Sequence, residues 1–282
     1  SNQVYVQKSQ LGGGSPMIRG FATNRVLLVV DGVRFNNAIF RSGNVQNVIS
    51  LDPNVIENSE VIFGPGSVVY GSDAIGGVMD FHTLQPKLAV DKPFTVAANA
   101  LMRYSSANQE NTAHVDVNMG TKKWGFVSSI TYADFGDLKQ GKNGPDEYLR
   151  NDYVERVNDT DVVRLNADPT LQLTSGYNQL NAMQKVRFRP NSNWDIHYAF
   201  HYSKTSRYDR YDRLILKNEN GDFTSAEWYY GPQKWQMHSL HVNYVKPTSL
   251  FDAARLVIGY QNYEESRHNR NFESANRNNR FE

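Results

Sequence analysis

Apolar and polar residues alternate along most of the chain, in segments of roughly ten residues that turn residues separate. This two-residue period predicts strands with one apolar face and one polar face. In one such segment, Trp194 and Ile196 lie on one face, whereas Asp195 and His197 lie on the other. Seven strands are predicted in this way, over residues 94–104, 113–120, 124–134, 180–189, 194–203, 239–245 and 254–261.

The connections between these strands are short at one end and mostly long at the other. The short turns cover residues 121–123, 190–193 and 247–252, and the long polar segments cover 135–179, 207–234 and the tail from 264. This asymmetry is typical of outer-membrane β-barrels, and Trp124 and Trp194 beside short turns fit an interfacial aromatic girdle. A soluble β-sandwich also shows alternation, but loops of such length are uncommon in compact soluble domains.

The first 88 residues have a different pattern. They contain the continuous apolar run 26–30, which predicts a strand buried on both faces, and many glycines. The stretch 60–83 mixes glycines with valines and aromatic residues. Because glycine tolerates positive φ and close approach of backbone, this stretch predicts tight turns between short strands.

Composition narrows the function classes. Among 282 residues there is no cysteine, which excludes disulfide frameworks, thiol catalysis and cysteine-based zinc sites. The net charge of +1 predicts no general affinity for nucleic acid. No apolar run approaches the roughly 20 residues of a membrane helix. The chain does not begin with Met, and we expect its N-terminus to be a processed or truncated edge.

Catalytic and metal-binding patterns are weak. Ser67 and Ser72 lie among glycines but do not form a nucleophile elbow, so we expect no enzyme activity. His197 and His201 share one face of a strand about 13 Å apart, too far to hold one metal ion. We therefore predict no catalytic residue, no bound cofactor and no resident metal.

A series of short motifs in the first 83 residues resembles the plug domain of TonB-dependent outer-membrane receptors. The motifs are Ile18-Arg19-Gly20, Asp31-Gly32, Val55-Ile56-Glu57, Glu60-Val61, Gly64-Pro65-Gly66-Ser67, Tyr70-Gly71 and Ala74-Ile75-Gly76-Gly77-Val78. Residues 40–50 look like receptors of the Bacteroidetes type, such as those for haem or siderophores.

The resemblance implies a small α+β plug over residues 1–88, followed over 89–282 by the first antiparallel transmembrane strands of a 22-stranded barrel. Seven strands do not close such a barrel. We therefore expect an all-β fragment from inside a receptor of about 650–750 residues.

The resemblance also implies a function. We expect energy-coupled import of a ferric siderophore or haem across the outer membrane of a Gram-negative bacterium, with TonB and its inner-membrane complex as partner. Cobalamin and glycans are alternative cargoes, and a soluble β-rich binding or adhesion module is the alternative class. We further expect a monomeric barrel in contact with lipid and lipopolysaccharide, and no nucleic-acid partner.

Three charged plug residues, Arg19, Glu57 and Glu60, are predicted to be buried. By resemblance to the family they would form an ionic lock that gates plug movement. The alternative is that Arg19 only satisfies backbone carbonyl groups.

Substrate-binding residues are predicted in two places. One is the plug loop 34–46, where side chains could hold an anionic, partly aromatic ligand by charge and stacking. The other is the basic outer mouth, which would attract anionic substrates, although contact with lipopolysaccharide or plain solubility would explain it equally. The predicted residues are Asn36, Asn37, Phe40, Arg41 and Asn44 in the plug loop, and Arg207, Arg210 and His268 at the mouth, with His268 as a possible haem ligand.

Overall fold

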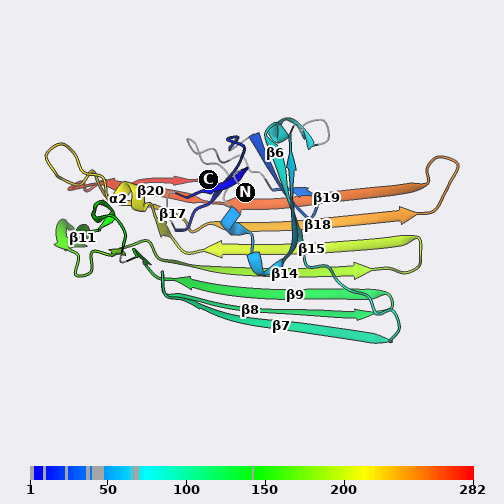
Figure 1. The fold of residues 1–282 in the computed structure, drawn as a ribbon. Coiled ribbons are helices and arrows are strands. Elements are labelled where there is room, and N and C mark those ends of the chain that lie inside the picture. Colours follow the sequence, from blue (N-terminus) through cyan, green and yellow to red (C-terminus); the bar gives the residue numbers. More distant parts are fainter. Residues whose placement is uncertain are drawn as a thin grey trace.

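A small plug lies against one face of a seven-stranded sheet (Figure 1). The computed structural model describes residues 3–8, 11–22, 25–35, 39, 48–64, 66, 70–141 and 143–282. Within these residues, no helix is long and apolar enough to cross a membrane. The long connections gather at one end of the large sheet, and the short turns lie at the other end (Figure 1).

The large sheet confirms all seven predicted strands. It is antiparallel throughout, in the order β19-β18-β15-β14-β9-β8-β7. Within the described residues, β7 and β19 each pair on one side only. The strands are β7 Phe94–Ser105, β8 Glu110–Thr121, β9 Trp124–Phe135, β14 Tyr177–Phe188, β15 Trp194–Thr205, β18 Lys234–Val245 and β19 Ala253–Glu264.

In strands β8 and β9 the polar face is covered and the apolar face is exposed, whereas most of β7 and β19 is exposed on both faces. In β8, His114 and Asp116 are buried, whereas Val115 between them is 43% exposed. In β9, Thr131 is buried while Ile130 is 52% exposed. A soluble sandwich would bury the apolar face, so this inverted pattern argues for a wall that faces lipid outside and the plug inside.

Aromatic side chains cluster beside the short turns. The ring of Trp124 stacks on Phe188, with centroids 4.1 Å apart, across two paired strands. Trp194 packs on Tyr244 in the same way at 4.6 Å. Both tryptophans are partly exposed, at 43% and 39%. This arrangement agrees with the predicted aromatic girdle at one membrane interface.

The plug contains a four-stranded mixed sheet in the order β4-β3-β6-β5, and a separate hairpin. The apolar run predicted to be buried forms β3, and all five of its residues are buried. It pairs parallel with β6 on one side, which explains why both of its faces are apolar. The elements are β1 Val4–Gln7, β2 Ser15–Ile18, β3 Val26–Val30, β4 Val33–Arg34, β5 Ile56–Phe63, β6 Gly77–Thr83, and the 3-10 turns η2 Val48–Ser50, η3 Pro53–Val55 and η4 Ser72–Ala74.

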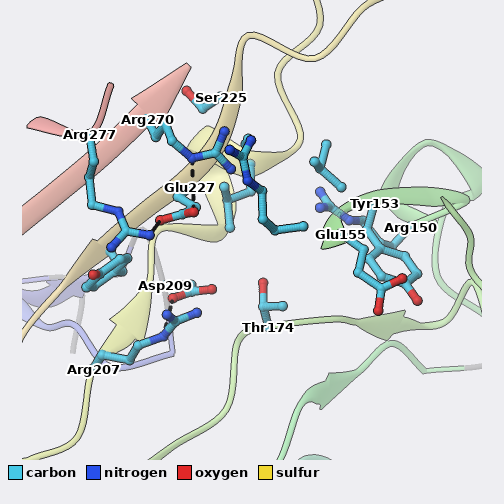
Figure 2. Close-up of a pocket in the computed structure, with 15 residues that line it drawn as sticks. Arg150, Tyr153, Glu155, Thr174, Arg207, Asp209, Ser225, Glu227, Arg270 and Arg277 are labelled. Carbon is cyan, nitrogen blue, oxygen red and sulfur yellow. Dashed lines mark hydrogen bonds and ion pairs between the residues drawn. The ribbon is translucent and has the colours of Figure 1, made fainter. Parts of the chain in front are cut away.

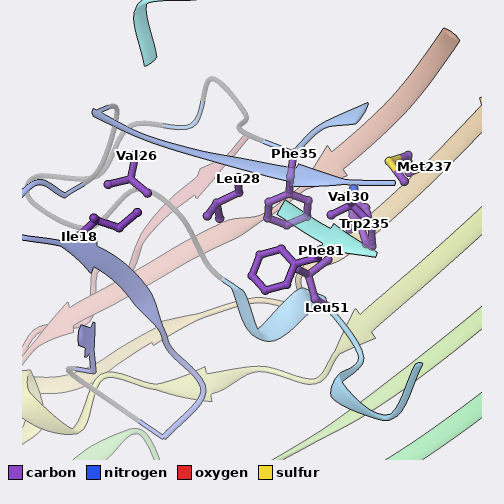
Figure 3. Close-up of a cluster of buried hydrophobic side chains, with 9 residues drawn as sticks. All are labelled: Ile18, Val26, Leu28, Val30, Phe35, Leu51, Phe81, Trp235 and Met237. Carbon is purple, nitrogen blue, oxygen red and sulfur yellow. The ribbon is translucent and has the colours of Figure 1, made fainter. Parts of the chain in front are cut away.

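The main apolar cluster joins the plug to the wall (Figure 3). Plug residues Leu28, Val30 and Phe35 pack there with Trp235 and Met237 of β18. The rings of Phe35 and Trp235 meet edge to face, with centroids 5.1 Å apart. The plug core is therefore completed by side chains of the barrel wall.

The glycine-rich stretch forms the predicted turns. Gly64 and Gly71 have positive φ values of 91°, and Gly77, at the start of β6, has a φ of 140°. The chain then leaves β6 at Thr83 and enters β7 at Phe94. The predicted domain boundary at residue 88 falls in this connection and stays a prediction.

The long connections form small sheets of their own beyond the ends of the wall strands (Figure 1). One contains β16, β17, β20 and β21, and two others are the pairs β10–β13 and β11–β12. Their elements are β10 Leu138–Lys139, η5 Asp146–Tyr148, β11 Asp152–Val157, β12 Thr160–Leu165, β13 Leu171–Gln172, β16 Tyr208–Asp209, α2 Tyr211–Leu214, β17 Ser225–Tyr230, β20 Ser266–Asn271 and β21 Asn278–Phe281.

Candidate functional site: the plug junction and the loop cavity

A buried ion pair joins the plug to the wall. Asp31 follows β3 and, with Gly32, turns the chain into β4 through positive φ values of 49° and 78°. Its Oδ2 atom lies 2.9 Å from Nζ of Lys185 on β14 and 3.3 Å from Nε2 of His201 on β15. Lys185 and His201 are only 3% and 4% exposed. Two wall residues thus face one plug carboxylate away from solvent.

Hydrogen bonds complete the environment of Asp31. The backbone N–H of Thr83 donates to Oδ1 at 3.0 Å, and the Thr83 hydroxyl donates to Oδ2 at 2.8 Å. Lys185 also donates to the carbonyl oxygen of Thr83 at 3.3 Å. Burial alone would raise the pKa of Asp31, but the close approach of His201 and the charge of Lys185 outweigh it, so this pKa is held below its usual range.

A second buried polar chain connects the plug to β8 and β9. The Thr131 hydroxyl donates to Oδ2 of Asp52 at 2.5 Å, and Nδ1 of His114 lies 2.6 Å from the same hydroxyl oxygen. Because the single hydroxyl proton goes to Asp52, Nδ1 of His114 is the donor of the second bond. Its Nε2 atom lies 3.2 Å from Oδ2 of Asp116. Asp52 also accepts from the backbone N–H of Asn54, at the start of η3.

Wall amides bind plug backbone at further points. Gln179 donates to the carbonyl oxygen of Ile49 at 2.6 Å, and Gln261 donates to that of Arg34 at 2.7 Å. Both contacts join residues that lie more than a hundred positions apart in sequence. The junction is thus largely made of polar contacts beside one apolar cluster, and such contacts can exchange with water when the plug moves.

The predicted burial of Arg19, Glu57 and Glu60 is wrong: all three are exposed. Arg19 lies in a turn with a φ of 49°, donates to Gln3 at 3.1 Å and lies over the ring of Phe63 at 4.7 Å. The two glutamates lie on β5, at the edge of the plug sheet. Among the described residues, Arg19 donates to Gln3 and Glu60 accepts from Asn58, and neither glutamate contacts Arg19. That the three residues form a lock that gates the plug stays a prediction.

The long connections enclose a cavity of about 310 Å³ (Figure 2). Its walls come from β11, β16, β17 and β20. The charged residues that line it are Arg150, Arg156, Arg207, Arg270 and Arg277, with Glu155, Asp209 and Glu227. Arginines outnumber carboxylates, so the cavity favours an anionic guest.

One buried carboxylate holds three of the long connections together. Asp161 on β12 accepts from Nη1 and Nη2 of Arg270 on β20, at 2.7 Å each. It also accepts from Arg156 at 3.0 Å, and Arg270 donates onward from Nε to Glu227 on β17 at 3.0 Å. The hydrogen bonds from Arg270 are the main cause that lowers the pKa of Asp161 to about 2.

The structure separates the three predicted mouth residues. Arg207 lines the cavity, 3.5 Å from Asp209, with its guanidinium over Tyr229 (Figure 2). Arg210 does not line it and instead forms two hydrogen bonds with Asp212, of 2.7 and 2.6 Å. His268 lies on β20, within the same long connections, but its side chain is buried there, and its role as a haem ligand stays a prediction.

The ring of His268 stacks on Tyr229 with centroids 4.6 Å apart, and its Nδ1 atom lies 2.6 Å from Oδ1 of Asn279. Among the described residues, no cluster of His, Asp or Glu could hold a metal ion. The predicted plug-loop residues Asn36, Asn37, Phe40, Arg41 and Asn44 lie outside the described residues.

Several functional residues were missed from sequence. Asp31 was identified only as part of an Asp-Gly motif, and Lys185 and His201 only as polar positions on their strands. The signal was present, because both wall residues fall on the polar face that an outer-membrane barrel turns inward. Arg150 and Asp161 lie in a long loop without periodicity, so no pattern singled them out.

Comparison with known proteins agrees with this architecture. Residues 2–78 match the TonB-dependent Receptor Plug Domain family. The chain is 45% identical over 82 residues to a protein named vitamin B12 transporter BtuB of Vibrio vulnificus strain CMCP6, a match that covers 28% of this chain and 13% of that protein.

Solved structures match over nearly the whole chain. A copper transporter, OprC, superposes with a TM-score of 0.67 at 14% identity, covering 94% of this chain and 34% of OprC. The FrpB iron transporter of Neisseria meningitidis (F3-3 variant) gives 0.66 at 14% identity, covering 95% of this chain and 37% of FrpB. The chain thus spans little more than a third of these structures, and at this identity they establish the fold alone.

A plug seated on the polar face of strands whose apolar face is exposed is the architecture of plug-and-barrel outer-membrane proteins. The N-terminal part of this chain is a TonB-dependent receptor plug domain, and the strands that follow form a portion of the receptor barrel. Such receptors reside in the outer membrane of Gram-negative bacteria, and the family is one of receptors rather than enzymes, as predicted.

Proposed function

We propose that this chain is the plug and the first wall strands of a receptor that imports an iron-bearing anionic chelate, a ferric siderophore or haem, with energy supplied through TonB. The observation that carries the proposal is the seating of the plug. Asp31 of the plug lies against Lys185 and His201 of the wall, so the plug is seated on the wall without any covalent bond.

The geometry suits a plug that blocks the lumen and can be displaced. Substrate binds between the long connections and the plug, and a pull from the periplasmic side then separates plug from wall. Each broken polar contact leaves groups that water can solvate, because the inner faces of the strands are polar. The chain's own part is binding and gating, and no covalent step is required of it.

The loop cavity supports an anionic cargo. Five arginines line it, and three carboxylates only partly balance them (Figure 2). An iron chelate or a haem carries oxyanion groups that such a cavity attracts. Of the two fold relatives described above, FrpB is named an iron transporter, which supports iron as the metal, whereas OprC is named a copper transporter.

Cobalamin is the second candidate. The relative named vitamin B12 transporter shares 45% identity with this chain, although over only 82 residues. In the proposed function the plug couples the receptor to TonB whatever the cargo, whereas the long connections contact the cargo. A match of 82 residues therefore says little about which cargo is bound. We therefore rank cobalamin below iron chelates.

The outer face of the wall supports a membrane partner. Its exposed apolar residues and the partly exposed Trp124 and Trp194 suit contact with lipid and lipopolysaccharide. We further propose that the barrel is monomeric, so that this outer face contacts lipid and not a second barrel.

A deletion strain tests the proposal. Cells that lack the complete receptor are supplied with ⁵⁵Fe-labelled siderophores, haem or labelled cobalamin, and uptake is measured with and without a plasmid copy. Restored uptake of an iron cargo that disappears in a strain without TonB supports the proposal. Uptake of cobalamin alone would replace iron with the second candidate, and restored uptake without TonB would contradict the coupling.

A further inference from the structure

Arg150 is a buried guanidinium without a matching acid. It is 5% exposed, and within the described part of the chain neither its Nε nor its Nη1 atom has a hydrogen-bond partner. The nearby carboxylate of Asp152 is engaged by Lys217, whose Nζ atom lies 2.5 Å away. A buried charge left in this state costs free energy that a bound anion would recover.

The position of Arg150 is fixed by its own backbone. Its N–H donates to the carbonyl oxygen of Pro169 at 2.7 Å, and its carbonyl oxygen accepts from the buried Asn166 amide at 2.8 Å. Both partners belong to the same long connection. The backbone of Arg150 is therefore held in place before any ligand arrives, and burial restricts its side chain, which together lower the entropy cost of binding.

Two aromatic rings lie against Arg150. Its guanidinium carbon is 5.3 Å from the ring centre of Tyr211 and 5.9 Å from that of Phe223. The same three residues, with Tyr148, line a second cavity of about 550 Å³. Arg150 also lines the 310 Å³ cavity (Figure 2), so one residue contributes to both cavities.

The other arginines of the first cavity are paired, which sets Arg150 apart. Arg270 is bound by Asp161 and Glu227, and Arg277 pairs with Glu227 at 2.5 Å. Two carboxylates line the larger cavity: Glu147 is exposed, and Asp152 is neutralised by Lys217, which lines the same cavity. The positive charge of Arg150 favours an anion, and the rings of Tyr211 and Phe223 beside it favour a flat anion over a spherical one.

We propose that the cavity walled by Arg150, Tyr211 and Phe223 is a subsite for an aromatic carboxylate. The carboxylate accepts hydrogen bonds from the unpartnered guanidinium nitrogens, and its ring packs on the two aromatic side chains. The cavity volume suits one or two fused rings. The inference rests on the proposed function in one respect, that the long connections face the medium and meet the cargo.

The test uses the complete receptor in detergent and 2-naphthoate as the probe, with fluorescence anisotropy as the readout. We expect saturable binding that benzoate displaces and that cyclohexanecarboxylate and inorganic phosphate displace at least tenfold less well. Arg150→Gln is expected to weaken binding at least tenfold. The matched control is Arg213→Gln on α2, a side chain that is 51% exposed and that we expect to change binding less than twofold.

Arg150→Lys keeps the charge and loses the planar fork, so we expect weaker binding by roughly three- to tenfold. Folding of each variant is judged by the heat-dependent gel shift of the barrel. If Arg150→Gln fails to fold, binding by Arg150→Lys tests the subsite in its place. The subsite is wrong if the wild type shows no saturable binding, if both Arg150 variants bind within twofold of it, or if cyclohexanecarboxylate or phosphate competes as well as benzoate.

Failure of the subsite and failure of import give different results. If uptake is normal but binding of 2-naphthoate does not depend on Arg150, only the proposed subsite is wrong. If binding of 2-naphthoate depends on Arg150 but the receptor restores no uptake, the proposed import is wrong and the subsite stands.

Discussion

Arg270 and Asp161 form a two-point hydrogen-bonded ion pair, with both N–O distances at 2.7 Å, between residues that are 109 positions apart. The pair is buried, and through Glu227 it joins the β11–β12 hairpin to β17 and β20. It holds the walls of the loop cavity in place before a ligand binds.

Asp161→Asn is expected to loosen these connections. The change removes the charge that Arg270 and Arg156 both bind and leaves Glu227 as the remaining acidic partner of Arg270 among the described residues, which costs about 3 kcal/mol of local stability. Trypsin should then cut within the connections of the folded receptor at least tenfold faster. The control is Glu155→Gln, which removes an exposed pair with Arg164 in the same hairpin and should change the rate less than twofold. Equal rates for wild type and Asp161→Asn would contradict the structural role of the pair.

The same pair predicts how the connections respond to acid. Because Asp161 has a pKa of about 2 in the folded protein and a higher value when unfolded, its stabilisation is present above about pH 4. It is lost as the pH falls through about 2. Hydrogen exchange of β12 and β20 amides should stay slow from pH 7 to 4 and become faster only below about 3, after correction for intrinsic exchange.

Asp209 predicts a pH dependence of the opposite sense. Burial raises its pKa to about 6, although Arg207 acts against this shift, and Thr174, Asp137 and Glu227 are the other polar groups that face it. A raised carboxyl pKa favours the folded state at low pH, and this contribution is lost as the pH rises through about 6.

Below that pH the 310 Å³ cavity also loses one negative charge, and Arg150 of the subsite lines this cavity together with Asp209. Binding of 2-naphthoate should therefore tighten several-fold between pH 7.5 and 5, and Asp209→Asn should reduce this difference to less than twofold. A wild-type affinity that stays constant over this range would show that Asp209 does not titrate in the folded receptor.

The ion pair at the junction predicts how firmly the plug is held. Lys185→Met leaves Asp31 buried without its cation, and we expect this to lower the stability of the seated plug by about 3–5 kcal/mol. The double variant Asp31→Asn/Lys185→Met removes both charges and should recover part of that loss.

Urea-induced exposure of the plug to protease measures the effect. The control is Lys204→Met on β15, where the lysine is exposed. If the double variant is less stable than Lys185→Met, the two side chains do not act as a pair.

The sequence predicted the wall better than the junction, for a physical reason. A strand that faces lipid on one side repeats every two residues, so Val115, Ile130 and their neighbours reveal it locally. The partners of Asp31 lie on β14 and β15, far along the chain, and no local period connects them. Arg19, Glu57 and Glu60 were predicted to be buried because they are charged residues within plug motifs, yet burial depends on which element covers them. The loop cavity was harder still, because Arg150 and Asp161 belong to an irregular connection that only the folded structure brings together.

At two glycines of the wall, Gly120 and Gly259, the N-terminal part of the chain approaches the wall backbone too closely for a side chain. A Cβ atom on Gly120 of β8 would lie 2.1 Å from the carbonyl oxygen of Lys87, which belongs to the connection between plug and barrel. A Cβ atom on Gly259 of β19 would lie 2.6 Å from a methyl group of Val33. Backbone cannot yield as a side chain can, so Gly120→Ala should displace the connection, at a cost of about 1–3 kcal/mol.

Gly259→Ala should have a smaller effect, because the Val33 side chain can change rotamer. Gly141→Ala is the control, since nothing lies within 4 Å of its Cβ position. Crosslinking between cysteines placed at Lys87 and Asn118, whose side chain accepts from the Lys87 N–H at 3.0 Å, reports the seating of the connection. The yield should fall clearly for Gly120→Ala and stay near the parent value for Gly141→Ala. An unchanged yield for Gly120→Ala would mean that the connection does not need the close approach that this glycine permits.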